Sequence, residues 1–547
     1  MELLDFTPEL LDEIISWSMP AGFESLALSC KTVYMRCESR IRRHNALKKR
    51  WSRAINVYSR GRDTLRLIHE IAKDPLIARY ITSLCLWGRP KDVDPMYLFE
   101  ELDVDFRHDK AAVQQIKDLI LGSPIRSYLQ EAGVNPEEWW EQFLMARSYW
   151  IYPEQIKVPD LVGDKPTKDN EEYAFVSLLF LLPNLKSVTP HGSWNDVDWS
   201  PGSHETQFIF PVLDALVKAS NNSTWATHPL GSLETVFPWC HPGYERKTRF
   251  DHIQWFAQLP SAKTVYVTSC TATDPFMASS SFSWRNQAFS SNITRLEFAF
   301  CCMNANNISN LLSHMPKLQV FKYSHEIKQQ GQFLDWDAGP FVDAVAKHCG
   351  TTVIELAVTV NNRTGHIESG VTSFHNFKKL KRLEIDLQIL CGPPADSRRR
   401  LGYYGRVLAG VEKWGLDDLS CLATLLPTSL EAFIVYIERS EHDDRALEVL
   451  LKGFREERAR RLPDLEKLLF RQWYDDSSWS PLADKDRGND KIRSLVQDAG
   501  CELEAYLPQH QISHRRDRKE RFPLWIREFE DKVGGVVYGN RPIGNVG

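Results

Sequence analysis

The chain has 547 residues, of which 43% are hydrophobic and 25% are charged. This composition is typical of a globular protein with a large core, and it excludes a chain that is disordered throughout. The net charge of -5 at pH 7 gives no overall attraction to nucleic acid or to acidic membranes. We therefore expect neither nucleic acid nor a membrane as a partner.

No segment has the pattern of a targeting or membrane-spanning sequence. Residues 1–11 lack the basic flank of a secretory signal, and the most hydrophobic stretch, 174–182, is shorter than the roughly 20 residues that cross a bilayer. The eleven cysteines form no C-x-x-C pair, and the adjacent Cys301 and Cys302 lack the spaced partners of a zinc site. These patterns predict a cytoplasmic or nuclear protein with reduced thiols and no metal or other cofactor.

The N-terminal residues predict two short helices. Thr7 followed by Pro8 is a helix start, because a hydroxyl caps the first turn and proline fits the first helical position. Residues 19–22 break the pattern, and a second helix is expected near Phe23. The apolar positions of the two helices are Leu10, Leu11, Ile14, Ile15 and Trp17 in the first, and Phe23, Leu26 and Cys30 in the second.

The run FTPELLDEIISWSMPAGFESLALSCKTVY, from Phe6 to Tyr34, resembles an F-box. The family pattern is a Leu-Pro-x-Glu-Leu opening, an apolar helix, a proline break, and an apolar helix that ends in Cys and a basic residue. The matching positions are Phe6, Thr7, Glu9, Leu10, Ile14, Ile15, Trp17, Pro20, Phe23, Leu26, Cys30 and Lys31. Residues 67–88 are also similar to the segment that follows the F-box in many fungal members. The opening departs from the family at Phe6 and Thr7.

The resemblance implies a module of three short helices that docks on the Skp adaptor subunit of a cullin-RING ubiquitin ligase, and through it reaches the cullin. The docking residues that it implies are Phe6, Pro8, Leu10, Leu11, Ile14, Ile15, Phe23, Leu26 and Cys30. From helix periodicity alone, the same apolar residues could simply pack against one another or against the rest of the chain. Both interpretations stay open at this point.

The rest of the chain carries a recurring apolar-x-x-apolar-x-apolar pattern. Apolar residues also occur two positions after its middle residue, which predicts short strands with one face inward. The middle residues are Leu84, Val265, Leu296, Phe321, Leu356, Leu383, Phe433 and Leu468, with weaker copies at Val188 and Val236. At the turn position, where leucine-rich repeats place Asn or Cys, the chain has Cys270, Cys301 and Asn361, while other copies depart from the pattern.

Amphipathic helices that end at an apolar-Pro pair are expected before several of these strands, because proline cannot continue a helix. The pairs are Leu182-Pro183, Leu259-Pro260, Met315-Pro316, Leu426-Pro427 and Leu462-Pro463. Successive strands lie roughly 30 residues apart, as in helix-plus-strand repeats. The predicted fold is therefore α/β: an irregular leucine-rich-repeat-like solenoid with parallel strands on its concave side and helices on its convex side.

The predicted organisation has four parts. Residues 1–52 are the F-box-like helical module, 53–78 a helical linker, 79–510 the repeat body, and 511–547 a C-terminal tail. Long excursions interrupt the body at 190–204, 271–291 and 390–414. Whether the concave face or such loops bind a partner is not decided by the sequence.

We find no motif for catalysis. The chain lacks a P-loop, a G-x-G-x-x-G fingerprint, a G-x-S-x-G elbow and an H-E-x-x-H helix. The carboxylate pairs 417–418, 443–444 and 475–476 are interpreted as helix starts or turns. The tryptophans Trp194, Trp199, Trp225 and Trp239 favour packing or a protein-binding patch over sugar binding. The basic runs at 36–53 and 515–521 favour solvated faces over phosphate binding.

These patterns predict an adaptor and not an enzyme. Its F-box-like helices hold the Skp adaptor of an SCF-type ligase, and its repeat body binds a substrate protein for ubiquitin-dependent degradation. The alternative is a repeat scaffold for protein-protein interaction that does not engage the ligase, which the altered opening at Phe6 and Thr7 keeps open.

Overall fold

The structure is a computed structural model of the chain. The residues that it describes are 3–56, 62–86, 109–144, 171–190, 208–220, 228–238, 247–250, 254–272, 282–328, 335–362, 367–394, 397, 399–401, 412–438, 443–473, 485–505 and 522–537. The predicted basic run at 515–521 and tryptophans 194, 199, 225 and 239 lie outside these residues. So do the carboxylates 475–476 and most of the excursion 190–204.

The chain divides into two compact units. Unit 1 consists of Met1–Trp239 and Leu259–Ala262, and unit 2 consists of Cys240–Gln258 and Lys263–Gly547. This division falls inside the predicted repeat body, a boundary that the repeat pattern did not indicate. The predicted limits at residues 52, 78 and 510 stay predictions.

Unit 1 begins with three helices, the number expected for the F-box-like module, and together we call them the N-terminal module. A short 3-10 turn, η1 (Leu3–Asp5), precedes them. Helix α1 starts at Pro8 as predicted, and the hydroxyl of Thr7 accepts a hydrogen bond from the Leu10 N–H at 3.5 Å. The three helices are α1 (Pro8–Trp17), α2 (Phe23–Ala27) and α3 (Lys31–Trp51).

The remainder of unit 1 combines four parallel strands with helices. The strands are β1 (Arg53–Asn56), β2 (Ser83–Leu86), β3 (Ser187–Thr189) and β4 (Thr235–Val236). Leu84 pairs with Val188 and Val188 with Val236, so these predicted strand positions are confirmed and share one register. The helices are α4 (Arg62–Lys73), α5 (Leu76–Tyr80), α6 (Lys110–Leu121), α7 (Ile125–Glu131), α8 (Pro136–Leu144), α9 (Glu171–Leu181) and α10 (Ile209–Ser220).

Unit 2 contains a parallel sheet whose strands β5 to β16 lie mostly in chain order. The predicted middle residues of the repeat pair in one continuous register across neighbouring strands: Val265, Leu296, Phe321, Leu356, Leu383, Phe433 and Leu468. The strands are β5 (Thr264–Thr268), β6 (Arg295–Cys301), β7 (Val320–Glu326), β9 (Glu355–Asn362), β11 (Arg382–Asp386), β14 (Ala432–Glu438), β15 (Lys467–Trp473) and β16 (Glu502–Ala505).

Four of the described helices of unit 2 precede predicted apolar-Pro pairs. Helix α11 precedes Leu259-Pro260, α12 precedes Met315-Pro316, α15 precedes Leu426-Pro427, and α17 precedes Leu462-Pro463. The helices are α11 (Gln254–Ala257), α12 (Ala305–Leu312), α13 (Ala338–Cys349), α14 (Leu387–Leu390), α15 (Leu422–Leu425), α16 (Asp443–Leu451), α17 (Phe454–Arg461), α18 (Lys485–Asp498) and α20 (Leu524–Val537).

Unit 2 also contains short elements outside its main sheet. Two pairs of short parallel strands lie outside the main sheet, and a 3-10 turn follows the second pair. They are β8 (Trp336–Asp337) with β10 (Ile367–Ser369), β12 (Arg400–Leu401) with β13 (Lys413–Trp414), and η9 (Leu416–Asp418).

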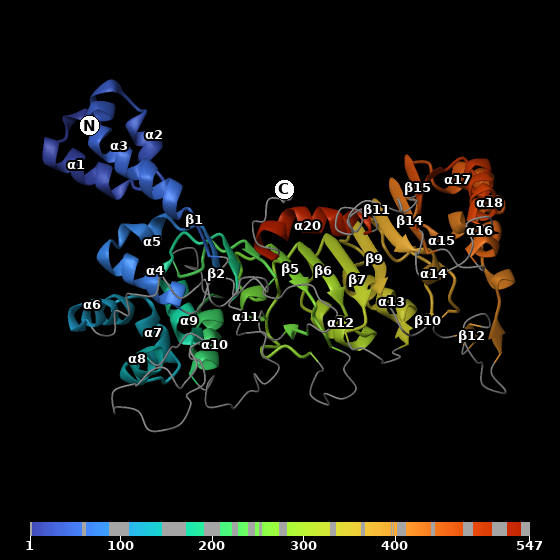
Figure 1. The fold of residues 1–547 in the computed structure, drawn as a ribbon, viewed down its shortest axis with the longest axis horizontal. Coiled ribbons are helices and arrows are strands. Elements are labelled where there is room, and N and C mark those ends of the chain that lie inside the picture. Colours follow the sequence, from blue (N-terminus) through green and yellow to red (C-terminus); the bar gives the residue numbers. More distant parts are fainter. Residues whose placement is uncertain are drawn as a thin grey trace. The chain divides into compact units, whose positions relative to one another are not determined.

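The two faces of the unit 2 sheet have different coverings (Figure 1). On one face, Phe321 and Tyr323 of β7 contact the ring of Phe341 in α13, with centroid separations of 6.3 and 4.4 Å. Lys322, between them, points to the opposite face because side chains alternate along a strand. There it meets α20, the last described helix (Figure 1). The fold class is therefore α/β with parallel sheets.

Candidate functional site

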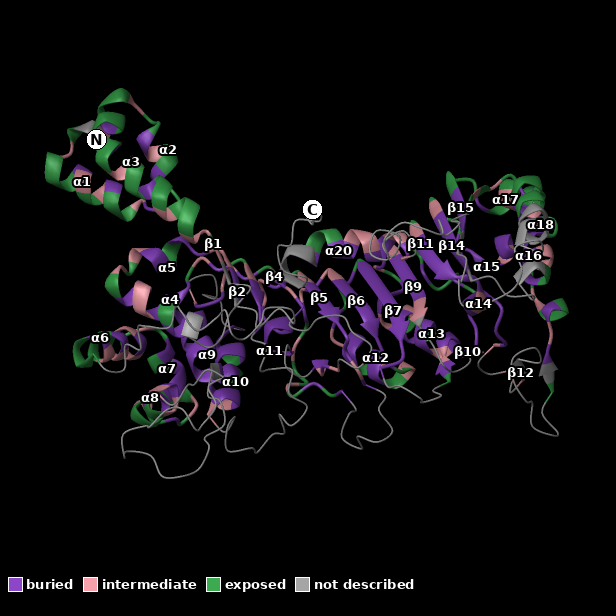
Figure 2. Ribbon diagram, in the orientation of Figure 1, coloured by how far each residue is buried: buried purple, intermediate pink, exposed green. Residues whose placement is uncertain are grey.

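The N-terminal module exposes several large apolar side chains. Among the residues that the structure describes, the exposed large hydrophobics are confined to this module, with Leu28 at 76% and Trp17 at 70% exposure. Figure 2 shows the contrast between its largely exposed helices and the buried strands of unit 2. Exposed apolar groups of this size favour a protein-binding surface. We call the full group the exposed apolar set: Leu10, Trp17, Leu28, Tyr34 and Met35.

The docking residues implied by the F-box resemblance divide between the surface and the interior of the module. Pro8 and Leu10 are exposed, whereas Phe6, Ile14, Leu26 and Cys30 are partly buried. Leu11, Ile15 and Phe23 are at most 3% exposed and form the core of the module with Met19, Ala27, Val33, Cys37 and Tyr80. These interior residues hold the helices together, so in this arrangement a partner can reach only the others.

Sequence reasoning did not include four members of the exposed apolar set among the docking residues. Trp17 is the last residue of α1 and of the predicted stripe, Leu28 is the C-cap of α2, and Tyr34 and Met35 lie in α3. A helical wheel of α3 identifies Val33 and Cys37 as one face and leaves Tyr34 and Met35 outside it. The sequence signal for these exposed residues was therefore an apolar side chain that lies outside the buried face of its helix.

The basic run at 36–53 is built into the module through ion pairs. Arg36 and Arg40 of α3 contact the Asp12 carboxylate of α1 at 3.8 and 3.4 Å. The Lys48 ammonium contacts Glu24 of α2 at 2.6 Å, and its hydrogen bond, together with that of His44, holds the pKa of the Glu24 carboxyl below its usual value. These ion pairs of the basic run connect α1 and α2 to α3.

A buried histidine links the module to the helix that follows it. His44 of α3 is 2% exposed, and its Nδ1 lies 2.7 Å from the hydroxyl of Tyr80 in α5. Its Nε2 lies 3.1 Å from the Glu24 carboxylate, and its ring packs 4.8 Å from that of Phe23. Burial raises the pKa of Tyr80 to about 12, so its hydroxyl stays neutral at physiological pH. The site thus holds α2, α3 and α5 together.

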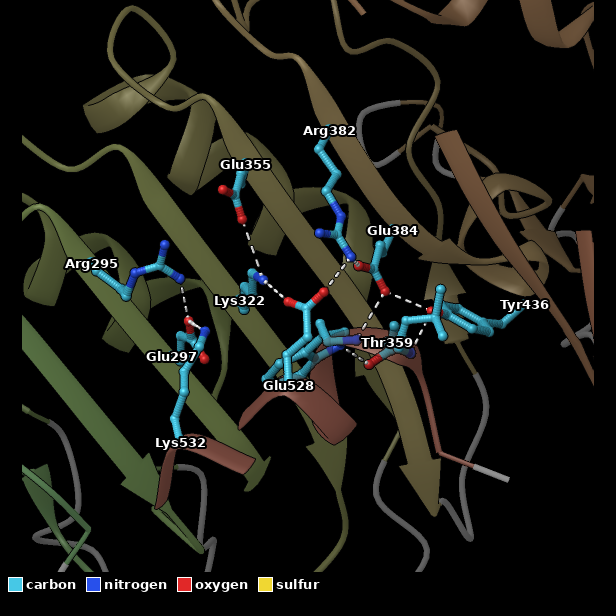
Figure 3. Close-up of polar contacts among 12 residues, drawn as sticks. Arg295, Glu297, Lys322, Glu355, Thr359, Arg382, Glu384, Tyr436, Glu528 and Lys532 are labelled. Carbon is cyan, nitrogen blue, oxygen red and sulfur yellow. Dashed lines mark hydrogen bonds and ion pairs between the residues drawn. The ribbon is translucent and has the colours of Figure 1, made fainter. Parts of the chain in front are cut away.

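A second distinctive surface is the face of the unit 2 sheet that α20 covers (Figure 3). The helix crosses the strands from β14 to β5 and buries one side, with Trp525, Ile526, Phe529 and Val533 all at most 1% exposed. The Phe529 ring meets Tyr266 of β5 edge-on at 5.7 Å. We call the strand residues beneath the helix the α20 seat: Tyr266, Glu297, Lys322, Thr359, Arg382, Glu384 and Tyr436.

Charged groups of the α20 seat match charges on the helix. The Glu528 carboxylate lies 3.0 Å from the Lys322 ammonium of β7 and 2.8 Å from the Arg382 guanidinium of β11 (Figure 3). Burial alone would raise the pKa of Glu528, but these two cations outweigh it and hold that pKa below its usual value. One turn further along, the Lys532 ammonium lies 3.1 Å from the buried Glu297 carboxylate of β6.

The start of α20 is held by hydrogen bonds. The Trp525 indole N–H donates to the Thr359 hydroxyl at 3.0 Å, and its backbone N–H donates to the Glu384 carboxylate at 3.2 Å. The Leu524 N–H donates to the Tyr436 hydroxyl at 2.8 Å, which in turn donates to Glu384 at 2.6 Å. A carboxylate at the first turn also favours the helix dipole. These contacts fix where the helix begins on the sheet.

The predicted turn positions of the repeat lie beside one another at the carboxyl ends of β5 and β6. The Cys301 thiol accepts a hydrogen bond from the Cys270 backbone N–H at 3.2 Å, which is the role that the pattern assigns to this position. The residues before them, Ser269 and Phe300, both have positive φ, at 57° and 58°. Asn361, the third predicted turn residue, donates to the Glu326 carboxylate instead.

The described residues contain no cluster of three or more His, Cys, Asp or Glu side chains that could hold a metal ion, and none of their cysteines forms a disulfide. Asp417 and Asp418 lie in a 3-10 turn, where Asp418 pairs with Arg399, and Asp443 begins α16. A cavity of about 500 Å³ beside α20 is lined by no Ser, Cys or His.

Comparison with protein-family models and with curated protein sequences finds no match for the chain. The structure itself gives one further constraint: among the described residues, no helix combines the length and the apolar character needed to cross a membrane. The most hydrophobic stretch, 174–182, lies in and just after α9 and is buried within unit 1.

Proposed function

We propose that the chain is a substrate-recognition adaptor of a cullin-RING ubiquitin ligase of the SCF type. The N-terminal module docks on the Skp-family adaptor, which connects it to the cullin, and the rest of the chain binds a substrate protein in the cytoplasm or nucleus. The chain contributes proximity, because it raises the local concentration of the substrate near the activated ubiquitin. The chemistry takes place on the recruited conjugating enzyme.

The observation that carries this proposal is the exposed apolar set. A small module with a closed core of its own has no internal need for Trp17, Leu28 and Met35 on its surface, and exposing them to water is unfavourable. Covering each of them by a partner would contribute about 1.5–3 kcal/mol. The resemblance of residues 6–34 to an F-box supplies the chemistry of that partner: a groove on a Skp-family adaptor that accepts apolar helices.

The irregular array of parallel strands supports the second half of the proposal. Repeated strand units in one register provide a long, rigid framework of the kind that repeat proteins use to present surfaces to partners. The continuous pairing from Val265 to Leu468 is such a framework. In this proposal, the strand array orients a bound substrate protein toward the ligase.

The test is a pull-down of the full chain with a purified Skp-family adaptor. Trp17→Asp/Leu28→Asp removes two exposed apolar groups and is expected to weaken binding by at least about a hundredfold, since 1.4 kcal/mol corresponds to a factor of ten. The control is Ala46→Asp, which introduces one such carboxylate at an exposed position of α3. The control should bind like the native chain.

Two results would count against the proposal. If the native chain does not bind the adaptor, the module is not a docking module and the chain is better described as a repeat scaffold. If the double variant binds as well as the native chain, docking does not use the exposed apolar set.

A further inference from the structure

The α20 seat has the character of a recognition surface more than that of a core. Three of its charged groups, Glu297, Lys322 and Glu384, are at most 1% exposed although they stand on the middle of a sheet. Glu297 and Lys322 lie opposite each other in the register of β6 and β7, and within the sheet they form ion pairs with Arg295 and Glu355. Replacing a buried ion pair with apolar side chains is often neutral or stabilising, so such charges contribute little to a permanent core. Their usual contribution is to decide which partner fits.

The groups on α20 that meet the seat follow a spacing that any amphipathic helix can present. Trp525, Glu528, Phe529 and Lys532 occupy positions i, i+3, i+4 and i+7, which lie on one face of a helix. Glu528 contacts Lys322 and Arg382, and Lys532 contacts Glu297. The rings of Trp525 and Phe529 lie on either side of Glu528 along this face. The seat therefore recognises a particular order of side chains and not an apolar surface alone.

The contacts of α20 also suit a helix that leaves and returns. The side chains of Glu528 and Lys532 are 38% and 34% exposed, so their ion pairs are partly screened by water.

We propose that the α20 seat is a helix-binding site and that α20 is its internal ligand. The partner that it fits is an amphipathic helix with the order aromatic, acid, aromatic, base at i, i+3, i+4 and i+7, supplied by a second protein. Such a helix takes the seat by displacing α20. The proposal does not depend on the ligase function, because it concerns unit 2 alone.

The test uses a fluorescent peptide with the sequence of residues 522–537 and the full-length chain. In the native chain, α20 competes for the seat, and the peptide binds weakly. In the variant Trp525→Ala/Glu528→Lys, the internal ligand is weakened, and we expect the peptide to bind at least about tenfold more tightly. A peptide that carries Glu528→Lys should lose this binding, because it places a cation against Lys322 and Arg382.

The matched control on the chain is Asp531→Lys, which makes the same change of charge at an exposed position of α20. This variant should bind the peptide as weakly as the native chain. A folded Trp525→Ala/Glu528→Lys variant that does not bind the peptide more tightly than the native chain would overturn the proposal.

If that variant does not fold, hydrogen exchange of the native chain decides the question. The proposal expects the amides of α20 to exchange at least about tenfold faster than those of β6, β7 and β9, because the helix opens while the sheet stays formed. Equal protection of helix and strands would mean that α20 is an integral part of the core, and the proposal would be wrong.

Discussion

The N-terminal module and the α20 seat differ in which side chains they expose and which they bury. The module has a closed core and leaves large apolar side chains in water, whereas the seat carries buried charges and is covered by the chain's own helix. If both proposals hold, the open apolar surface selects its partner mainly by shape, and the covered surface selects by charge and requires exchange of α20.

The largest expected effect separates the interior of the module from its surface. Ile15→Asp places a carboxylate among Leu11, Phe23 and Val33 and should destabilise the module by more than about 4 kcal/mol. Leu28→Asp changes an exposed position and should alter the free energy of unfolding by less than about 0.5 kcal/mol. Hydrogen exchange of α1 to α3 measures both. Equal destabilisation by the two variants would remove the distinction between core and exposed set.

An intermediate effect is expected from the charges of the seat. A double-mutant cycle with Lys322→Met and Glu528→Gln should give a coupling energy of about 1–2 kcal/mol in the opening free energy of α20, because Lys322 is almost fully buried. The control cycle uses the pair Glu457 and Arg461 within α17, in which neither side chain is fully buried and whose coupling should stay below about 0.5 kcal/mol. Couplings of the same size would show that the seat is no more specific than a surface ion pair.

The smallest effect is a dependence on pH. Because the pKa of Glu528 is depressed in the folded chain, its contribution is complete above the ordinary value of 4.5 and is lost as the pH falls through the lower, folded value. Lys322 and Arg382 face this carboxylate, and Glu355 faces Lys322 as well. The opening free energy of α20 should differ between the native chain and Glu528→Gln above pH 4.5, and this difference should shrink as the pH falls below 4.5. A difference that is constant with pH would contradict the expected role of the Glu528 carboxylate.

The strands were predictable because their signal is local. Alternating apolar residues around Leu296, Phe321 and Leu356 predict strands and also the register in which they pair. The start of α1 at Pro8 and the helix ends at apolar-Pro pairs depend on the same kind of short-range chemistry. The strands β1 and β16 carry too few apolar residues for the pattern and were missed.

The place of α20 was not predictable, because its contacts are remote in sequence. Residues 511–547 were expected to be a tail, and the spacing of Trp525, Phe529 and Val533 is the only local sign of an amphipathic helix there. Glu528 meets Lys322 and Arg382 from distances of 206 and 146 residues along the chain. Such pairings follow from the folded sheet and leave no periodic trace in the sequence.

The proposal of a docking module is tested most directly by hydrogen exchange of the full chain with and without a purified Skp-family adaptor. The account predicts added protection in α1, α2 and the first turns of α3, where Leu10, Trp17, Leu28, Tyr34 and Met35 lie, and unchanged exchange in the strands of unit 2. No added protection in these helices, or protection confined to unit 2, would contradict it.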